Sequence, residues 1–273
     1  MSNLVKLITV AAAVVFFLTS LVLYGNLGRR DRDVTEAREL LEQTVRVEVH
    51  HLVDIHVVMP DGTELDSDEP QEYGGFGSGF VAEVRKKKTG VESLVVTASH
   101  VCHTFEIETK EMDTIFGKVK ITAKTKSIVM KVMTSHGDEL EASTLFDDER
   151  NDMCILRVIG RAGKVATLAD SMPEAGARLI HTGAPMTLFG DGLGAVVDGR
   201  SMGILKFGES WYLGMMLATR GGSSGGPVWY NGEVVGTLVL GSVPDGNITF
   251  AIEVDHIRSA LIEARVKWPR VST

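Results

Sequence analysis

Three segments, each joined to an apolar strand-like run, constrain the fold of this chain more than any other feature. Residues 94–98 are apolar and β-branched, and His100 follows them. Asp152 comes directly before a second, largely apolar run at residues 153–158. A glycine-rich loop, Gly-Ser-Ser-Gly-Gly-Pro around Ser224, leads into a third. Such runs are typical of buried strands, so each of these three side chains is predicted at a strand end.

His100, Asp152 and Ser224 are the residue types of a nucleophilic serine with its base and an orienting acid. A serine hydroxyl needs a group that takes its proton and donors that hold the oxyanion. We expect Ser224 to attack a carbonyl, His100 to take its proton and Asp152 to orient the histidine. Gly222 and Ser224 are expected to supply the oxyanion-hole N–H groups, since glycine allows a backbone conformation that a side chain would hinder. Taken alone, the loop could instead be a flexible linker.

Two neighbouring acids compete with Asp152 for the orienting role. Asp147 and Asp148 lie in the polar stretch Phe-Asp-Asp-Glu-Arg. That stretch is typical of a solvated loop, and neither acid adjoins the apolar run that follows Asp152. We therefore assign the role to Asp152.

The sequence around these residues resembles the chymotrypsin-like serine proteases. Thr-Ala-Ser-His at residues 97–100 is similar to the family's Thr-Ala-x-His pattern, and Gly-Ser-Gly-Phe at 77–80 resembles a strand of HtrA-type and related bacterial and viral trypsin-like peptidases. The resemblance covers about residues 74–262. It implies an all-β fold of two six-stranded antiparallel barrels, at about 45–160 and 161–254, within a protease domain at 45–273.

A C-terminal helix is expected at about residues 255–265. Ile257, Ala260, Leu261 and Ala264 fall on one face at helical spacing. Chymotrypsin-like domains close with such a helix on the second barrel, so the resemblance implies the same element.

The resemblance also implies where the first side chain before the scissile bond, P1, would bind. The pocket is expected to include Ala218, Val239, Leu240, Gly241 and Thr249. The segments that carry these residues contain no Asp or Glu. A buried basic side chain without a partner is costly, so an apolar P1 residue is expected.

The N-terminal segment is expected to cross a membrane. Residues 7–24 are uncharged over 18 positions, about the minimum for a transmembrane helix. A signal peptide is the competing interpretation, but this run is longer than the usual apolar region and lacks a good cleavage site. We therefore expect a retained single-pass anchor with its flank at 1–32, followed by a short helical linker at 33–44.

The side of the membrane that carries the protease domain stays open. Arg29, Arg30 and Arg32 follow the span, which favours a cytoplasmic domain by the positive-inside rule. The resemblance to HtrA-type proteases favours the periplasm or the exterior.

The chain has two cysteines and a formal charge of −8. Cys102 and Cys154 lie in apolar surroundings and are expected to be buried free thiols, although a disulfide stays open because His100 and Asp152, which they follow, must meet. The acidic balance argues against a nucleic-acid partner. No metal or cofactor is expected: His50 and His51 point to opposite faces of a strand.

These observations predict a membrane-anchored serine endopeptidase that cleaves protein or peptide substrates. A non-catalytic binding module on the same fold is one alternative. An esterase is the other, but its usual nucleophile elbow comes in the order Ser, Asp, His. The sequence does not predict an oligomeric state.

Overall fold

The computed structural model describes residues 33–88, 90–103, 107–115, 117–208, 210–241 and 247–268. The chain divides into two units, Met1–Leu40 and Leu41–Thr273, and the second contains all the strands described below. Residues 33–41 are helical. The predicted membrane span at 7–24 lies outside the described residues, and no helix within them is both long and apolar enough to cross a bilayer.

The first eight strands form one antiparallel sheet. The strand order is β2-β1-β3-β4-β8-β7-β6-β5, and β1 also pairs with β6. This extra pairing joins β1, β3, β4, β8, β7 and β6 in a ring. The ring contains six strands, the number expected for the first barrel, and β2 and β5 pair outside it and bring the sheet to eight. The bounds are β1 Thr44–Val58, β2 Glu64–Asp66, β3 Gln71–Lys87, β4 Gly90–Thr97, β5 Ile107–Thr114, β6 Gly117–Met133, β7 Glu139–Asp148 and β8 Met153–Ile159.

The second sheet is a closed six-stranded barrel, as the sequence predicted. Its strands follow the order β10-β11-β14-β13-β12-β9. Leu179, Leu213, Met215, Val228 and Leu238 are buried together inside it, which is the alternation expected of strands with one face on a core. The bounds are β9 Arg178–Gly183, β10 Ala195–Phe207, β11 Ser210–Met216, β12 Pro227–Tyr230, β13 Glu233–Gly241 and β14 Ile248–Glu253; the 3-10 turn η1, Pro185–Thr187, follows β9.

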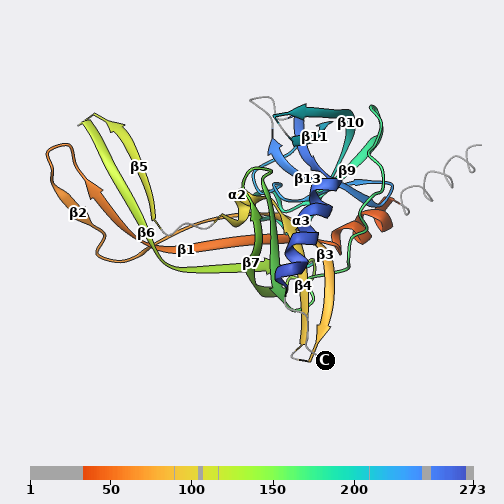
Figure 1. Cartoon of the computed structure of the whole chain (residues 1–273), viewed down its shortest axis with the longest axis horizontal. Coiled ribbons are helices and arrows are strands. Elements are labelled where there is room, and N and C mark those ends of the chain that lie inside the picture. The colour runs from red at the N-terminus through yellow and green to blue at the C-terminus, as the bar shows by residue number, and fades with distance from the viewer. Residues whose placement is uncertain are drawn as a thin grey trace, which may run out of the picture. The chain divides into compact units, whose positions relative to one another are not determined.

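Two helices complete the second unit. The single turn α2, Ser99–Cys102, carries His100 at the end of β4. The C-terminal helix α3, Val254–Lys267, buries Ile257, Ala260, Leu261 and Ala264, the face that the sequence predicted. It lies against β7 and β8 of the first sheet and against β13 and β14 of the barrel, so it contacts both sheets (Figure 1).

Strands β1 and β6 are longer than the ring requires. Their register shifts between Leu52 and Val53, and beyond that point they continue to pair as far as Val58 and Lys120. There β2 pairs with the end of β1, and β5 pairs with the start of β6 (Figure 1). We call this part the arm: residues 53–58 of β1, β2, β5 and residues 117–125 of β6.

Candidate active site

His100 and Asp152 are held against each other at the end of the first ring. His100 Nδ1 lies 2.8 Å from Asp152 Oδ2 and 3.0 Å from Oδ1. The backbone N–H of His100 also donates to Asp152 Oδ1 at 2.9 Å. Asp152 thus fixes both the backbone and the ring of His100. With Nδ1 as the donor, Nε2 is left as the basic nitrogen of the neutral ring.

Asp152 occupies a turn between β7 and β8, with φ of 50°. Aspartate tolerates this left-handed conformation better than most residues. The two acids that compete with it lie elsewhere: Asp147 accepts a hydrogen bond from Ser99 Oγ at 2.6 Å, and Asp148 accepts one from Asn151 Nδ2 at 2.6 Å. Among these three acids, the structure places Asp152 against His100.

The Ser224 loop, between β11 and β12, packs against the strands that lead to His100. The backbone N–H of Ser78 on β3 donates to the Ser224 carbonyl at 2.7 Å. A Cβ on Gly225 would lie 2.2 Å from both the Ser78 carbonyl oxygen and Thr97 Oγ1, so only glycine allows this approach. Thr97 ends β4, three residues before His100. Within the described residues, no hydrogen bond joins the Ser224 hydroxyl to His100.

The backbone at Gly222 has a left-handed conformation that favours glycine. Its φ is 94°, and a Cβ there would lie 2.5 Å from the Ala184 carbonyl oxygen and 2.5 Å from the Phe76 ring. Among the backbone hydrogen bonds of the described residues, neither Gly222 N–H nor Ser224 N–H is a donor. Neither group is therefore committed to a backbone acceptor among these residues, and their role in an oxyanion hole stays a prediction.

Ser78 is a connecting residue that the sequence analysis missed. It is buried, and its hydroxyl donates to the Gly222 carbonyl at 2.6 Å while accepting from Ala184 N–H at 2.8 Å. Thr97 Oγ1 donates to the Ser78 carbonyl at 2.7 Å. Ser78 thus joins β3 to the Ser224 loop, through Gly222, and to the segment after β9, through Ala184. A small polar residue between two glycines in a buried strand was the available signal.

A buried histidine lies under the same loop. His181 on β9 is 1% exposed, and its Nδ1 lies 3.0 Å from the Pro227 carbonyl oxygen. Its Nε2 has no hydrogen-bond partner among the described residues. Burial disfavours the charged ring and lowers the pKa of His181 to about 4, against the opposing effect of the Pro227 carbonyl. A Cβ on Gly226 would lie 2.6 Å from His181 Cε1, so the loop rests directly on this ring.

The residues predicted for the P1 pocket lie together at one end of the second barrel. Val239, Leu240 and Gly241 end β13, and Gly241 pairs with Thr249 on β14. Val239 and Thr249 are buried, whereas Ala218, after β11, is exposed. The side chains of residues 240 and 241 lie outside the described set. Their role in binding P1 stays a prediction.

The two cysteines form a disulfide, so the expectation of free thiols was wrong. Cys102 and Cys154 are bonded through sulfur, with their Cα atoms 6.6 Å apart. Thr97 pairs with Cys154 in the sheet, and His100 contacts Asp152. Cys102 lies two residues after His100 and Cys154 two residues after Asp152, so these contacts bring the two cysteines within reach of each other. The bond staples the segment that carries the base to the segment that carries the acid.

The sequence match decides the family. Residues 77–236 match the family model of the trypsin-like peptidase domain. The chain belongs to the trypsin-like peptidase family. It is therefore a serine peptidase, a hydrolase of peptide bonds, and the resemblance described above is confirmed. No protein with a curated function matches the sequence.

Solved structures of a mycobacterial peptidase share the fold of this trypsin-like peptidase. One is the active form of the Rv3671c protease from M. tuberculosis, with a TM-score of 0.56 and 16% identity over 84% of this chain and 83% of that one. The other is the inactive form of its Ser343Ala mutant, with a TM-score of 0.51 and 16% identity over 80% of this chain and 88% of that one.

Proposed function

We propose that this chain is a membrane-anchored serine endopeptidase with Ser224 as nucleophile, His100 as general base and Asp152 as the orienting acid. The observation that carries the proposal is that the Asp152 carboxylate is hydrogen-bonded to both Nδ1 and the backbone N–H of His100. That arrangement leaves Nε2 of His100 to act as the base. The close packing of the Ser224 loop on β3 and on the end of β4 supports the same assignment.

In the proposed reaction, Ser224 Oγ attacks the carbonyl carbon of the scissile peptide while His100 Nε2 takes its proton. The oxyanion of the tetrahedral intermediate is held by Gly222 N–H and Ser224 N–H. His100 then gives the proton to the leaving amine, and the carbon–nitrogen bond breaks to leave an acyl-enzyme. A water molecule, deprotonated by His100, hydrolyses this ester and restores Ser224.

The proposal includes an uncharged P1 pocket. Ala218, Val239, Leu240, Gly241 and Thr249 carry no charge, so a basic P1 side chain would have no ionic partner among them. We expect a peptide panel to be cleaved fastest at small or medium apolar P1 residues. Fastest cleavage after Arg or Lys would contradict this part of the proposal.

We further propose that residues 7–24 anchor the chain and that the protease domain faces an oxidising compartment. The Cys102–Cys154 disulfide supports that side, since such bonds persist outside the reducing cytoplasm. This argument opposes the positive-inside rule applied to Arg29, Arg30 and Arg32. Fusing a reporter that is active on only one side of the membrane to the C-terminus would decide between them.

The catalytic proposal is tested by labelling the full-length protein with a fluorophosphonate probe and incubating it with an unfolded protein substrate. We expect covalent labelling at Ser224 and cleavage of the substrate, with both lost in Ser224→Ala. Labelling without cleavage would favour an esterase. A folded wild-type protein that shows neither would favour the binding-module alternative.

A further inference from the structure

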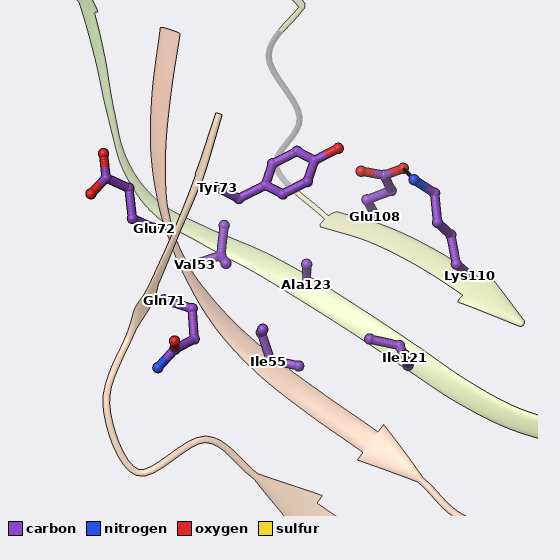
Figure 2. Close-up of a pocket in the computed structure, with 9 residues that line it drawn as sticks. All are labelled: Val53, Ile55, Gln71, Glu72, Tyr73, Glu108, Lys110, Ile121 and Ala123. Carbon is purple, nitrogen blue, oxygen red and sulfur yellow. Dashed lines mark ion pairs between the residues drawn. The ribbon is translucent and has the colours of Figure 1, made fainter. Parts of the chain in front are cut away.

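A groove of about 200 Å³ runs along one face of the arm (Figure 2). Its floor consists of Val53 and Ile55 from β1 and Ile121 and Ala123 from β6. Residues two apart on a strand share a face, and Ile55 pairs with Ala123 across the sheet, so the four side chains form one apolar surface. Such a floor suits the side chains of an extended apolar peptide.

Polar side chains line the edges of the groove. Tyr73 comes from β3, and Glu108 and Lys110 come from β5 (Figure 2). Glu108 and Lys110 form an ion pair of 2.8 Å with each other, so these two charges are already matched. Glu72 also lines the groove, and its Oε1 lies 2.5 Å from His50 Nδ1, outside the groove lining. The apolar floor therefore sets what the groove prefers.

The groove adjoins a hollow that reaches the candidate active site. A second hollow of about 170 Å³ is lined by His100, Val101 and Gly75, and Tyr73 and Glu108 line both hollows. His51 lines the hollow at His100 and Ile55 lines the groove, and both lie on β1. They are four residues apart, so the distance along the strand from the hollow to the groove is about 13 Å. An extended peptide of about four residues spans that distance.

A glycine opposite Val49 leaves space beside the hollow that contains His100. A Cβ on Gly75 would meet no atom within 4 Å, so the chain has space on that side beside the hollow that contains His100. Its neighbour Gly74 is different, since a Cβ there would lie 2.2 Å from the Val49 carbonyl oxygen. Gly74 is needed for packing within the sheet, whereas the absence of a side chain at Gly75 leaves room for another chain.

We propose that the arm groove binds the part of a polypeptide substrate that follows the scissile bond and selects apolar side chains there. This inference rests on the proposed function. His100 delivers its proton to the leaving amine, so the leaving half of the substrate begins beside His100. The hollow at His100 opens along β1 and β3 of the first sheet, whereas the residues proposed for the P1 pocket belong to the second barrel. The leaving half therefore extends along the arm.

The test compares two neighbouring substitutions on β6. Ala123→Trp fills the groove, and Lys124→Trp places the same side chain on the opposite, exposed face as a matched control. Tryptophan is well accepted in strands, so neither change is expected to unfold the arm. Circular dichroism and thermal unfolding of the full-length variants check this.

Each full-length variant is assayed on two substrates with the same acyl half. One is an internally quenched peptide library with four varied residues after the scissile bond, and the other ends in an aminomethylcoumarin amide. We expect the wild type to prefer apolar residues after the bond. Ala123→Trp should lower kcat/KM on the preferred extended peptides about tenfold, the effect of losing one buried apolar side chain. The coumarin amide should be unaffected, and Lys124→Trp should change neither rate.

Equal effects of Ala123→Trp on both substrates, or no effect on either, would overturn the groove proposal while leaving the catalytic proposal intact. If neither substrate is cleaved and Ser224 is not labelled, the catalytic proposal fails instead. The groove is then tested by binding of a fluorescein-labelled Ala-Leu-Ala-Leu-Ala-Leu amide to the Ser224→Ala chain. Binding that Ala123→Trp abolishes and Lys124→Trp preserves supports the groove, and any other pattern overturns it.

Discussion

Replacing Glu92 with glutamine should destabilise the protein strongly, because this carboxylate joins the C-terminal helix to the first sheet. The Glu92 side chain is only 8% exposed and pairs with Lys87 at 2.5 Å and with Arg157. Trp268 Nε1, just after α3, donates to Glu92 Oε2 at 2.7 Å. Burial alone would raise the pKa of Glu92, but hydrogen bonds from Arg157, Lys87 and Trp268 outweigh it and lower the pKa from 4.5 to about 2.

This pKa difference sets the expected magnitude. At about 1.4 kcal/mol per pKa unit, the ionised Glu92 contributes about 3 kcal/mol to the free energy of unfolding. Because the folded-state pKa is the lower one, the stabilisation is fully present above pH 4.5 and is lost as the pH falls toward 2. About 2 kcal/mol of it should be gone by pH 3. At pH 7, Glu92→Gln should cost about 3 kcal/mol or more, since it leaves two cations without their partner.

Urea unfolding of the full-length protein, followed by circular dichroism at pH 7 and at pH 3, measures both quantities. The difference between the wild type and Glu92→Gln should shrink markedly at the lower pH. Glu139→Gln is the control, because Glu139 belongs to an exposed pair with Lys131 and should matter little. A difference between wild type and Glu92→Gln that is the same at both pH values would refute the argument.

Three further changes test other parts of the structure. Ser78→Ala should lower kcat about tenfold with little change in KM, because the Gly222 carbonyl loses the hydrogen bond that fixes its peptide. Steady-state kinetics measure both constants, and a raised KM with an unchanged kcat would contradict this role. Replacing Cys102 and Cys154 together with serine should lower the free energy of unfolding by about 4 kcal/mol, as denaturant titration would reveal. As the pH falls from 6.5 to 4, the free energy of unfolding should drop by about 3 kcal/mol, because the unfolded chain takes up a proton at His181 while the folded chain, with the lower pKa, does not. His181→Asn should flatten that part of the stability curve, and an unchanged curve would contradict the assignment.

The candidate site was predictable because its signals are local. His100, Asp152 and Ser224 each adjoin a strand whose apolar pattern is visible in a few residues, and the structure places the first two in contact. The face of α3 that is buried was predictable for the same reason, since Ile257 and Leu261 repeat at helical spacing.

The arm and the disulfide depend on pairings that a local pattern does not specify. The start of β6 alternates apolar and polar residues, but its partner on β1 lies more than 60 residues earlier in the chain. The register that creates the groove therefore depends on tertiary contacts. Likewise, Cys102 and Cys154 carry no indication of their Cα separation in the sequence, and the pairing of β4 with β8 brings them together.

The most direct test of the central claim compares Asp152→Asn with Asp148→Asn in kcat/KM on one peptide substrate. Asn at 152 keeps the shape of the side chain but favours the wrong tautomer of His100, so the rate should fall by about 10⁴. Asp148 contacts Asn151 rather than His100, and its variant should stay within about tenfold of the wild type. A severe loss for Asp148→Asn together with a mild one for Asp152→Asn would contradict the proposed triad.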